Sequence, residues 1–100
     1  MIVRLDADGL VVQDADDLGR LHLESALDAA GLDAALRATG SGEGAGADHA
    51  LLDLAVLRSR ARLAASAPDW PERWAGMVAY AERKGWLSED GRSVQVHVER

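Results

Sequence analysis

Residues 69–100 read DWPERWAGMVAYAERKGWLSEDGRSVQVHVER and carry the clearest structural signals of the chain. Asp69 and Glu72 have the spacing of a capping box, in which side chains bond the free backbone N–H groups at the start of a helix. Gly85 suits the left-handed residue that often follows a helix. These signals predict a helix over residues 69–84.

One face of the predicted helix is apolar. The chain contains three Trp, one Tyr and no Phe, so tryptophan has to supply much of the bulky core volume. We therefore interpret this face as core, and any exposed remainder as a partner surface, because Trp is favoured at interface hot spots. The face consists of residues at helical spacing, which are Trp70, Trp74, Met77, Val78 and Ala81.

A hairpin is predicted after the helix. Residues 86–87 precede Asp90-Gly91, a dipeptide typical of type I′ turns because both central residues take positive φ. The strand that follows alternates valines with polar residues. We expect an exposed edge strand that pairs with the same strand of a second subunit, giving a homodimer. Its apolar residues are Val94, Val96 and Val98.

The order of helix, Trp-Leu pair, Asp-Gly turn and strand resembles the end of many winged-helix regulators, over residues 80–92. The resemblance implies a middle helix over 48–65, a recognition helix over 69–84 and a wing over 86–98. The net charge of −6 opposes binding to nucleic acid, so DNA binding stays the alternative function. In that alternative the contacts would come from Arg58, Arg60, Arg62 and Arg92.

The N-terminal residues 2–13 predict a second hairpin, because apolar and polar residues alternate on both sides of Asp8-Gly9. With this dipeptide at the centre of the turn, the apolar residues of the two strands share one face. Leu5 is then opposite Val12 and Ala7 is opposite Leu10.

The middle of the chain predicts helices. An acidic segment, Asp14 to Asp17, suits a helix start before a helix over 18–30 that ends at Gly31. Residues 20–24 also alternate like a strand, and a similar pattern recurs at 96–99, so two similar strands remain an alternative. Further predictions are a short helix over 32–39, a flexible Gly-rich loop over 40–47 and a broad apolar helix over 48–65 that Asp48 caps.

These elements predict one α+β domain over residues 1–100. Three to four helices pack on a small antiparallel sheet. The sheet is made from the N-terminal hairpin and the C-terminal helix–hairpin unit, whose ending is winged-helix-like.

The sequence shows few signs of catalysis. It contains no Cys, which excludes thiolate nucleophiles, disulfides and Cys-type zinc sites. His22, His49 and His97 lack a metal-binding spacing, and no Gly-x-Ser-x-Gly elbow or phosphate-binding loop is present. We expect no enzyme activity, no catalytic or metal-binding residues and no cofactor.

The N-terminus lacks a signal-peptide pattern, and no apolar run approaches the length of a membrane span. We expect a cytoplasmic protein that binds no membrane. Ten of the eleven basic residues are Arg, which indicates a high-GC bacterial gene.

The main functional prediction is a non-catalytic accessory or regulatory subunit that binds a partner protein. A second alternative is a small-ligand binder with a Trp-lined pocket. Either way, the predicted partner or ligand surface comprises Trp70, Trp74, Trp86 and His97.

Overall fold

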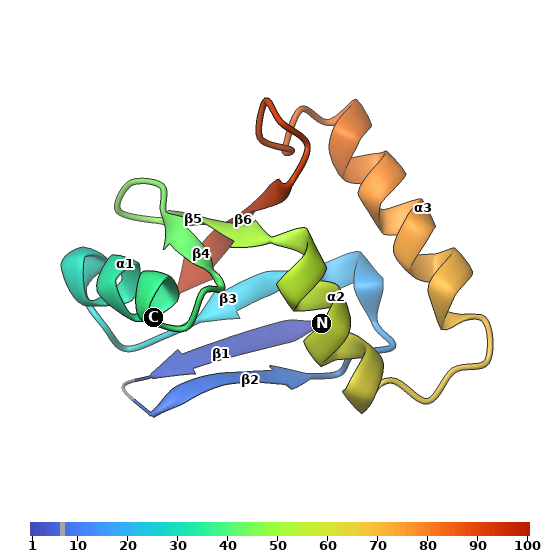
Figure 1. Cartoon of the computed structure of the whole chain (residues 1–100), viewed down its shortest axis with the longest axis horizontal. Coiled ribbons are helices and arrows are strands. Elements are labelled where there is room, and N and C mark those ends of the chain that lie inside the picture. The colour runs from blue at the N-terminus through green and yellow to red at the C-terminus, as the bar shows by residue number, and fades with distance from the viewer. Residues whose placement is uncertain (7) are drawn as a thin grey trace.

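The computed structural model describes residues 1–6 and 8–100. These residues form six strands, three helices and one short 3-10 turn (Figure 1). The strands are β1 (Ile2–Asp6), β2 (Gly9–Gln13), β3 (His22–Glu24), β4 (Gly42–Gly44), β5 (His49–Asp53) and β6 (Ser93–Glu99). The helical elements are η1 (Leu18–Arg20), α1 (Ala29–Ala38), α2 (Leu54–Ala64) and α3 (Trp70–Arg83).

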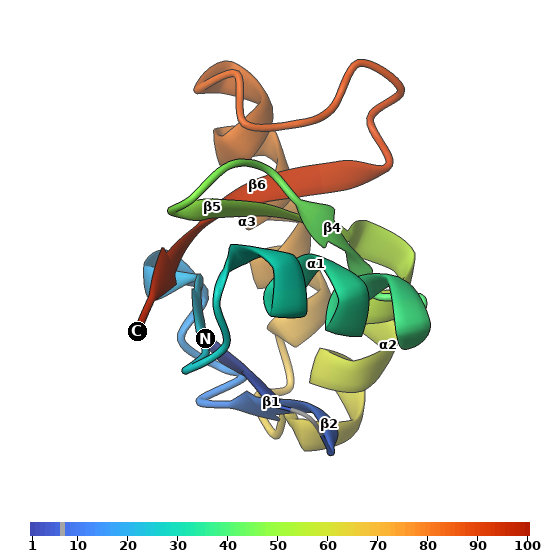
Figure 2. The ribbon, with the colours of Figure 1, turned by 90° about the vertical axis from the view of Figure 1, so that its left-hand side faces the viewer.

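The sheet has the strand order β2-β1-β3-β6-β5-β4 and curls into a half-barrel (Figure 2). Strands β1, β3 and β6 run parallel to one another, and the remaining pairs are antiparallel. The predicted small antiparallel sheet is therefore wrong, because the sheet is mixed and its six strands outnumber the three helices. The winged-helix-like ending is also wrong, because β6 does not belong to a terminal wing.

Strand β6 lies in the interior of the sheet, between β3 and β5. The predicted hairpin partner, residues 86–87, contributes one isolated bridge between Leu87 and Val94. The expected exposed edge for dimerisation is wrong, because β5 pairs with one edge of β6. On the other edge, β3 pairs with its last residues and residues 86–88 bond to its first half. Its apolar residues point into the core, and they are Val94, Val96 and Val98.

The predicted helix over 18–30 is replaced by η1 and β3, so the alternative with two similar strands holds. Leu23 and Val98 are register partners in the parallel pair β3–β6. Helix α1 begins later, where the Asp28 carboxylate accepts a hydrogen bond from the Gly31 N–H. Gly31 thus lies in the first turn of a helix and does not end one, because tertiary strand pairing outweighs the helical propensity of the preceding residues.

The predicted helix over 48–65 begins only at Leu54, where the Asp53 carboxylate accepts from the Val56 N–H. The preceding residues form β5, because Ala50 and Leu52 alternate into the core beside β6. Asp48 is therefore not the helix cap.

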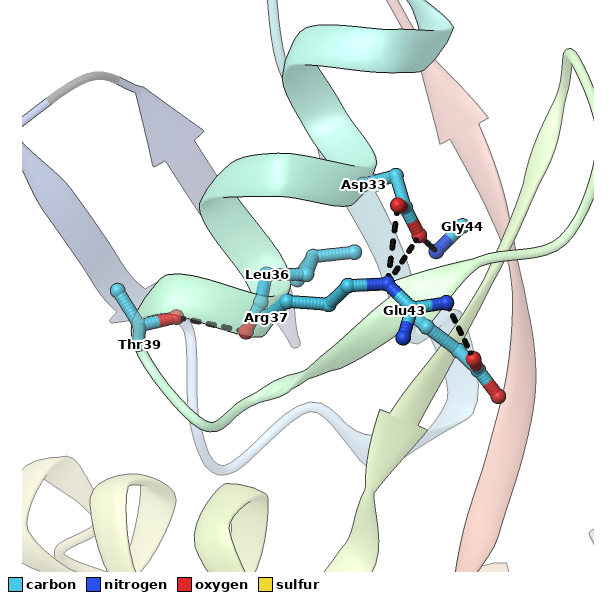
Figure 3. Close-up of polar contacts among 6 residues, drawn as sticks. All are labelled: Asp33, Leu36, Arg37, Thr39, Glu43 and Gly44. Carbon is cyan, nitrogen blue, oxygen red and sulfur yellow. Dashed lines mark hydrogen bonds and ion pairs between the residues drawn. The ribbon is translucent and has the colours of Figure 1, made fainter.

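The Gly-rich segment predicted as a flexible loop contains strand β4, which pairs with β5. Gly42 is required there, since its φ is 154° and a Cβ would lie 2.0 Å from the Leu51 carbonyl oxygen. The segment is also tied to α1 (Figure 3). The Asp33 carboxylate accepts from the Gly44 N–H, and Arg37 bridges Asp33 and Glu43.

The N-terminal hairpin forms, with a register shifted by two residues from the predicted one. Leu5 pairs with Leu10, and Val3 pairs with Val12. An even shift keeps the same side chains on the core face. The predicted contact of Ala7 lies outside the described residues.

Helix α3 is close to its predicted span, and Gly85 follows it with a φ of 75°. The Asp69 carboxylate pairs with Arg73 instead of capping the helix. Trp70 and Trp74 are 0% and 7% exposed and stack with ring centroids 5.4 Å apart. All three helices thus share one core with the sheet.

We predict that Trp74→Ala lowers the free energy of unfolding by about 3–5 kcal/mol, because it leaves a cavity beside Trp70. Urea denaturation followed by circular dichroism measures this loss. Trp86→Ala is the matched control, since Trp86 is 42% exposed and should change stability little. Equal stability of the two variants would contradict the core assignment.

Candidate functional site: a groove along helix α3

A groove of about 870 Å³ runs between α3, the segment 16–21 and strands β5 and β6. Its walls mix aromatic, imidazole and charged side chains. The volume is within the range of ligand-binding clefts. The functional side chains that line it are Arg20, His49, Arg73, Tyr80, Trp86 and His97.

The N-terminal end of α3 is fixed to the segment that forms the opposite wall. The Trp70 indole Nε1 donates a buried hydrogen bond to the Ala15 carbonyl oxygen at 2.8 Å. The Asp16 carboxylate accepts bonds from the Ser66 and Ala67 N–H groups and from the Ser66 hydroxyl. These bonds hold the pKa of Asp16 below its usual range, with the Ala67 N–H as the largest cause.

The C-terminal end of α3 positions Trp86. The Trp86 N–H donates to the Ala81 carbonyl and the Gly85 N–H to the Glu82 carbonyl, as in a Schellman-type helix end. The Trp86 carbonyl then accepts from the Gln95 N–H of β6 at 2.7 Å. The backbone of Trp86 is thus held by the helix and by the sheet, although its side chain is exposed.

An aromatic rim, formed by Tyr80 and Trp86, borders the groove. The two rings meet edge to face, with centroids 5.6 Å apart. Both side chains remain accessible, at 47% and 42% exposure. The Arg83 guanidinium and the Lys84 ammonium lie 5.9 Å and 5.6 Å from the Tyr80 ring centroid, which places two cations beside the rim.

A histidine pair contributes to the wall formed by β5 and β6. His49 on β5 and His97 on β6 are register partners, and their ring centroids are 5.7 Å apart in an edge-to-face arrangement. Imidazole nitrogens can donate or accept hydrogen bonds, so the pair offers polar contacts to an occupant of the groove.

The structure separates the predicted surface residues into two groups. Trp86 and His97 line the groove, whereas Trp70 and Trp74 belong to the core. Sequence reasoning missed Tyr80 and His49 as groove residues. Tyr80 lies off the apolar face of its helix, and the wrong helix prediction over 48–65 hid the strand register that pairs His49.

The predicted nucleic-acid residues do not form a recognition surface on α3. Arg58, Arg60 and Arg62 lie on α2, where the Arg60 guanidinium donates to the Leu10 carbonyl and Arg62 lies 5.9 Å from the Trp70 ring centroid. Arg92 lies in the turn before β6, where its carbonyl accepts from the Leu54 N–H.

Metal-ligating side chains gather outside the groove. Within the described parts of the chain, one group of three meets the distance requirement for a shared ion: His22, Glu24 and Glu99. They lie on β3 and β6.

The fold and the groove define a small α+β protein with a mixed, curled sheet and an open cleft beside its last helix. Comparison with protein-family models, with curated proteins and with solved structures gave no match. Among the described residues, no helix combines the length and apolar character needed to span a membrane.

We predict that Asp16→Asn lowers the unfolding temperature at neutral pH, because the amide removes the charge that the Ser66 and Ala67 groups stabilise. The pKa of Asp16 is lowered in the folded state, so its contribution is complete above the unfolded pKa and is lost as pH falls through the folded pKa. The difference in unfolding temperature between wild type and Asp16→Asn should become smaller only below about pH 4.

Thermal denaturation from pH 7 downwards measures this difference. Glu89→Gln is the control, since Glu89 is an exposed carboxylate outside the Asp16 contacts. A difference in unfolding temperature that stays constant to strongly acidic pH would show that the Asp16 charge does not act through its bonds with Ser66 and Ala67.

Proposed function

We propose that this chain is a non-catalytic accessory or regulatory protein that binds a segment of a partner protein along the groove beside α3. The observation that carries the proposal is the aromatic rim, in which Tyr80 and Trp86 are exposed on a fixed backbone. The expected setting is the bacterial cytoplasm.

The rim has the properties of an interface hot spot. Tyr and Trp contribute large contact areas and dominate binding energies at protein interfaces. The backbone of Trp86 is already bonded to Ala81 and Gln95, so docking requires little ordering of the chain. Little of the free energy gained by burying the two rings would therefore be lost to ordering the chain.

Charge indicates the chemistry of the partner segment. The protein carries a net charge of −6, and the groove is lined by both signs, Asp16 and Asp17 as well as Arg20 and Arg73. At the rim, however, Arg83 and Lys84 lie beside Tyr80. A segment with an apolar anchor and neighbouring acidic groups complements this local surface.

The DNA-binding alternative rested on the winged-helix resemblance. That resemblance implied a free wing over residues 86–98, whereas β6 is interior to the sheet. The partner that the groove favours is a protein.

A small ligand is a second candidate for the same groove. The histidine pair and the rim surround it with polar and aromatic groups, as in many ligand sites. A metabolite bound there would quench the fluorescence of Trp86, and Trp86→Phe would remove that part of the response.

The test of the proposal is affinity capture from host lysate at moderate salt, with nuclease present and mass spectrometric detection. We expect a stoichiometric protein that wild type captures and Trp86→Ala captures at least about tenfold less, since hot-spot truncations often cost more than 2 kcal/mol.

Leu63→Ala is the matched control, because Leu63 is an exposed apolar residue, at 90%, on α2 and outside the groove. It should capture the partner like wild type. Equal capture by wild type and Trp86→Ala would show that the rim does not bind the partner.

A further inference from the structure

We propose that His22, Glu24 and Glu99 form a binding site for a divalent first-row transition-metal ion such as Zn²⁺. The site is separate from the groove and independent of the function proposed for it. Its three ligand atoms lie within 4.8 Å of one another on two neighbouring parallel strands.

The strand register creates the site. Leu23 and Val98 are paired and point into the core, so the residues beside them point to the opposite face. Glu24 is paired with Glu99, and His22 lies two residues before Glu24 on the same face of β3. Three metal-ligating side chains therefore meet on the outer surface of the sheet.

The His22 ring is oriented as a ligand. Its Nδ1 lies 2.9 Å from the Arg20 carbonyl oxygen. A carbonyl can only accept, so Nδ1 carries the proton and Nε2 of the neutral ring carries the free lone pair. A backbone carbonyl bonded to the second ring nitrogen is a recurrent feature of metal-binding histidines.

The Nε2 atom of His22 faces two carboxylates. Nε2 is 3.6 Å from Glu24 Oε1 and 3.7 Å from Glu99 Oε2, which is too long for a hydrogen bond. Metal–ligand bonds of about 2.05 Å would separate tetrahedral ligands by about 3.4 Å. The two histidine–carboxylate distances are close to this separation, and all three ligand atoms lie within 4.8 Å of one another.

A cation would also stabilise the paired glutamates, Glu24 and Glu99. Like charges directly opposite on neighbouring strands destabilise a sheet. Arg4 donates from Nε to Glu24 Oε2 at 3.2 Å, which leaves Oε1 of Glu24 facing His22. No further hydrogen bond or ion pair of the Glu99 carboxylate is found among the described residues. A divalent ion would neutralise both carboxylates at once.

The donor set selects the class of metal. Imidazole with carboxylates suits zinc, iron, cobalt and nickel, whereas calcium and magnesium prefer oxygen ligands alone. Three protein ligands leave room for water, and the Glu99 side chain is 56% exposed. The site is thus accessible to an ion from solution.

The test uses the full chain after removal of metals with EDTA. Zn²⁺ is titrated calorimetrically, and Co²⁺ is titrated by visible absorption, which reports ligand geometry. We expect one equivalent bound with micromolar or tighter affinity, and a rise in unfolding temperature with Zn²⁺. His22→Ala and Glu99→Gln should each weaken binding at least about tenfold.

Glu89→Gln is the matched control for Glu99→Gln, because Glu89 is an exposed carboxylate that is not part of the cluster. It should bind both ions like wild type. Glu99→Gln keeps the test valid if His22→Ala does not fold, since Glu99 is a surface residue. Absence of saturable binding by wild type, unchanged affinity in Glu99→Gln, or loss of binding in Glu89→Gln would each overturn the proposal.

Discussion

The interior position of β6 is the constraint on which the rest of the structure depends. This last strand of the chain pairs in parallel with β3 and antiparallel with β5. It is therefore the one strand that connects β2-β1-β3 with β5-β4 in the described sheet. Without β6, the strands β2-β1-β3 and β5-β4 would be separate pieces, each too small to bury a core. The three buried valines of β6 fill the centre of that core. Because these pairings span most of the chain, the fold forms through long-range contacts.

The groove is a consequence of the same long-range closure. Segment 16–21 follows the N-terminal hairpin, α3 comes from the last third of the chain, and β5 and β6 supply the remaining wall. The Ala15–Trp70 and Asp16–Ser66 bonds fasten α3 to the N-terminal segment. The Gln95–Trp86 bond fastens the other end of α3 to the sheet. The walls are therefore positioned at both ends, which is the condition for a binding surface that does not have to be ordered on association.

Local signals predicted α3, the strand 93–99 and the N-terminal hairpin, because capping residues, glycine and strict alternation act over a few positions. They failed for β3 and β5. These strands have three and five residues and adjoin helical patterns, and Ala and Leu favour helix until a neighbouring strand supplies hydrogen bonds. The repeat of His-Leu-Glu and His-Val-Glu was the one signal of β3 beside β6. Residues His49 and Tyr80 could not be placed in a site before this register was known.

The two-residue period of β6 places its apolar side chains on one face and its polar side chains on the other. Its inward side chains are core valines, two of which, Val94 and Val96, also line the groove. Its outward side chains include polar members of both candidate sites. His97 belongs to the groove, and Glu99, one period further on, belongs to the histidine–glutamate cluster. Changes to outward residues remove little buried apolar area, so they should disturb binding with little effect on folding. Strand β6 thus holds the sheet together through its valines, and its outward side chains can be polar without disturbing the core.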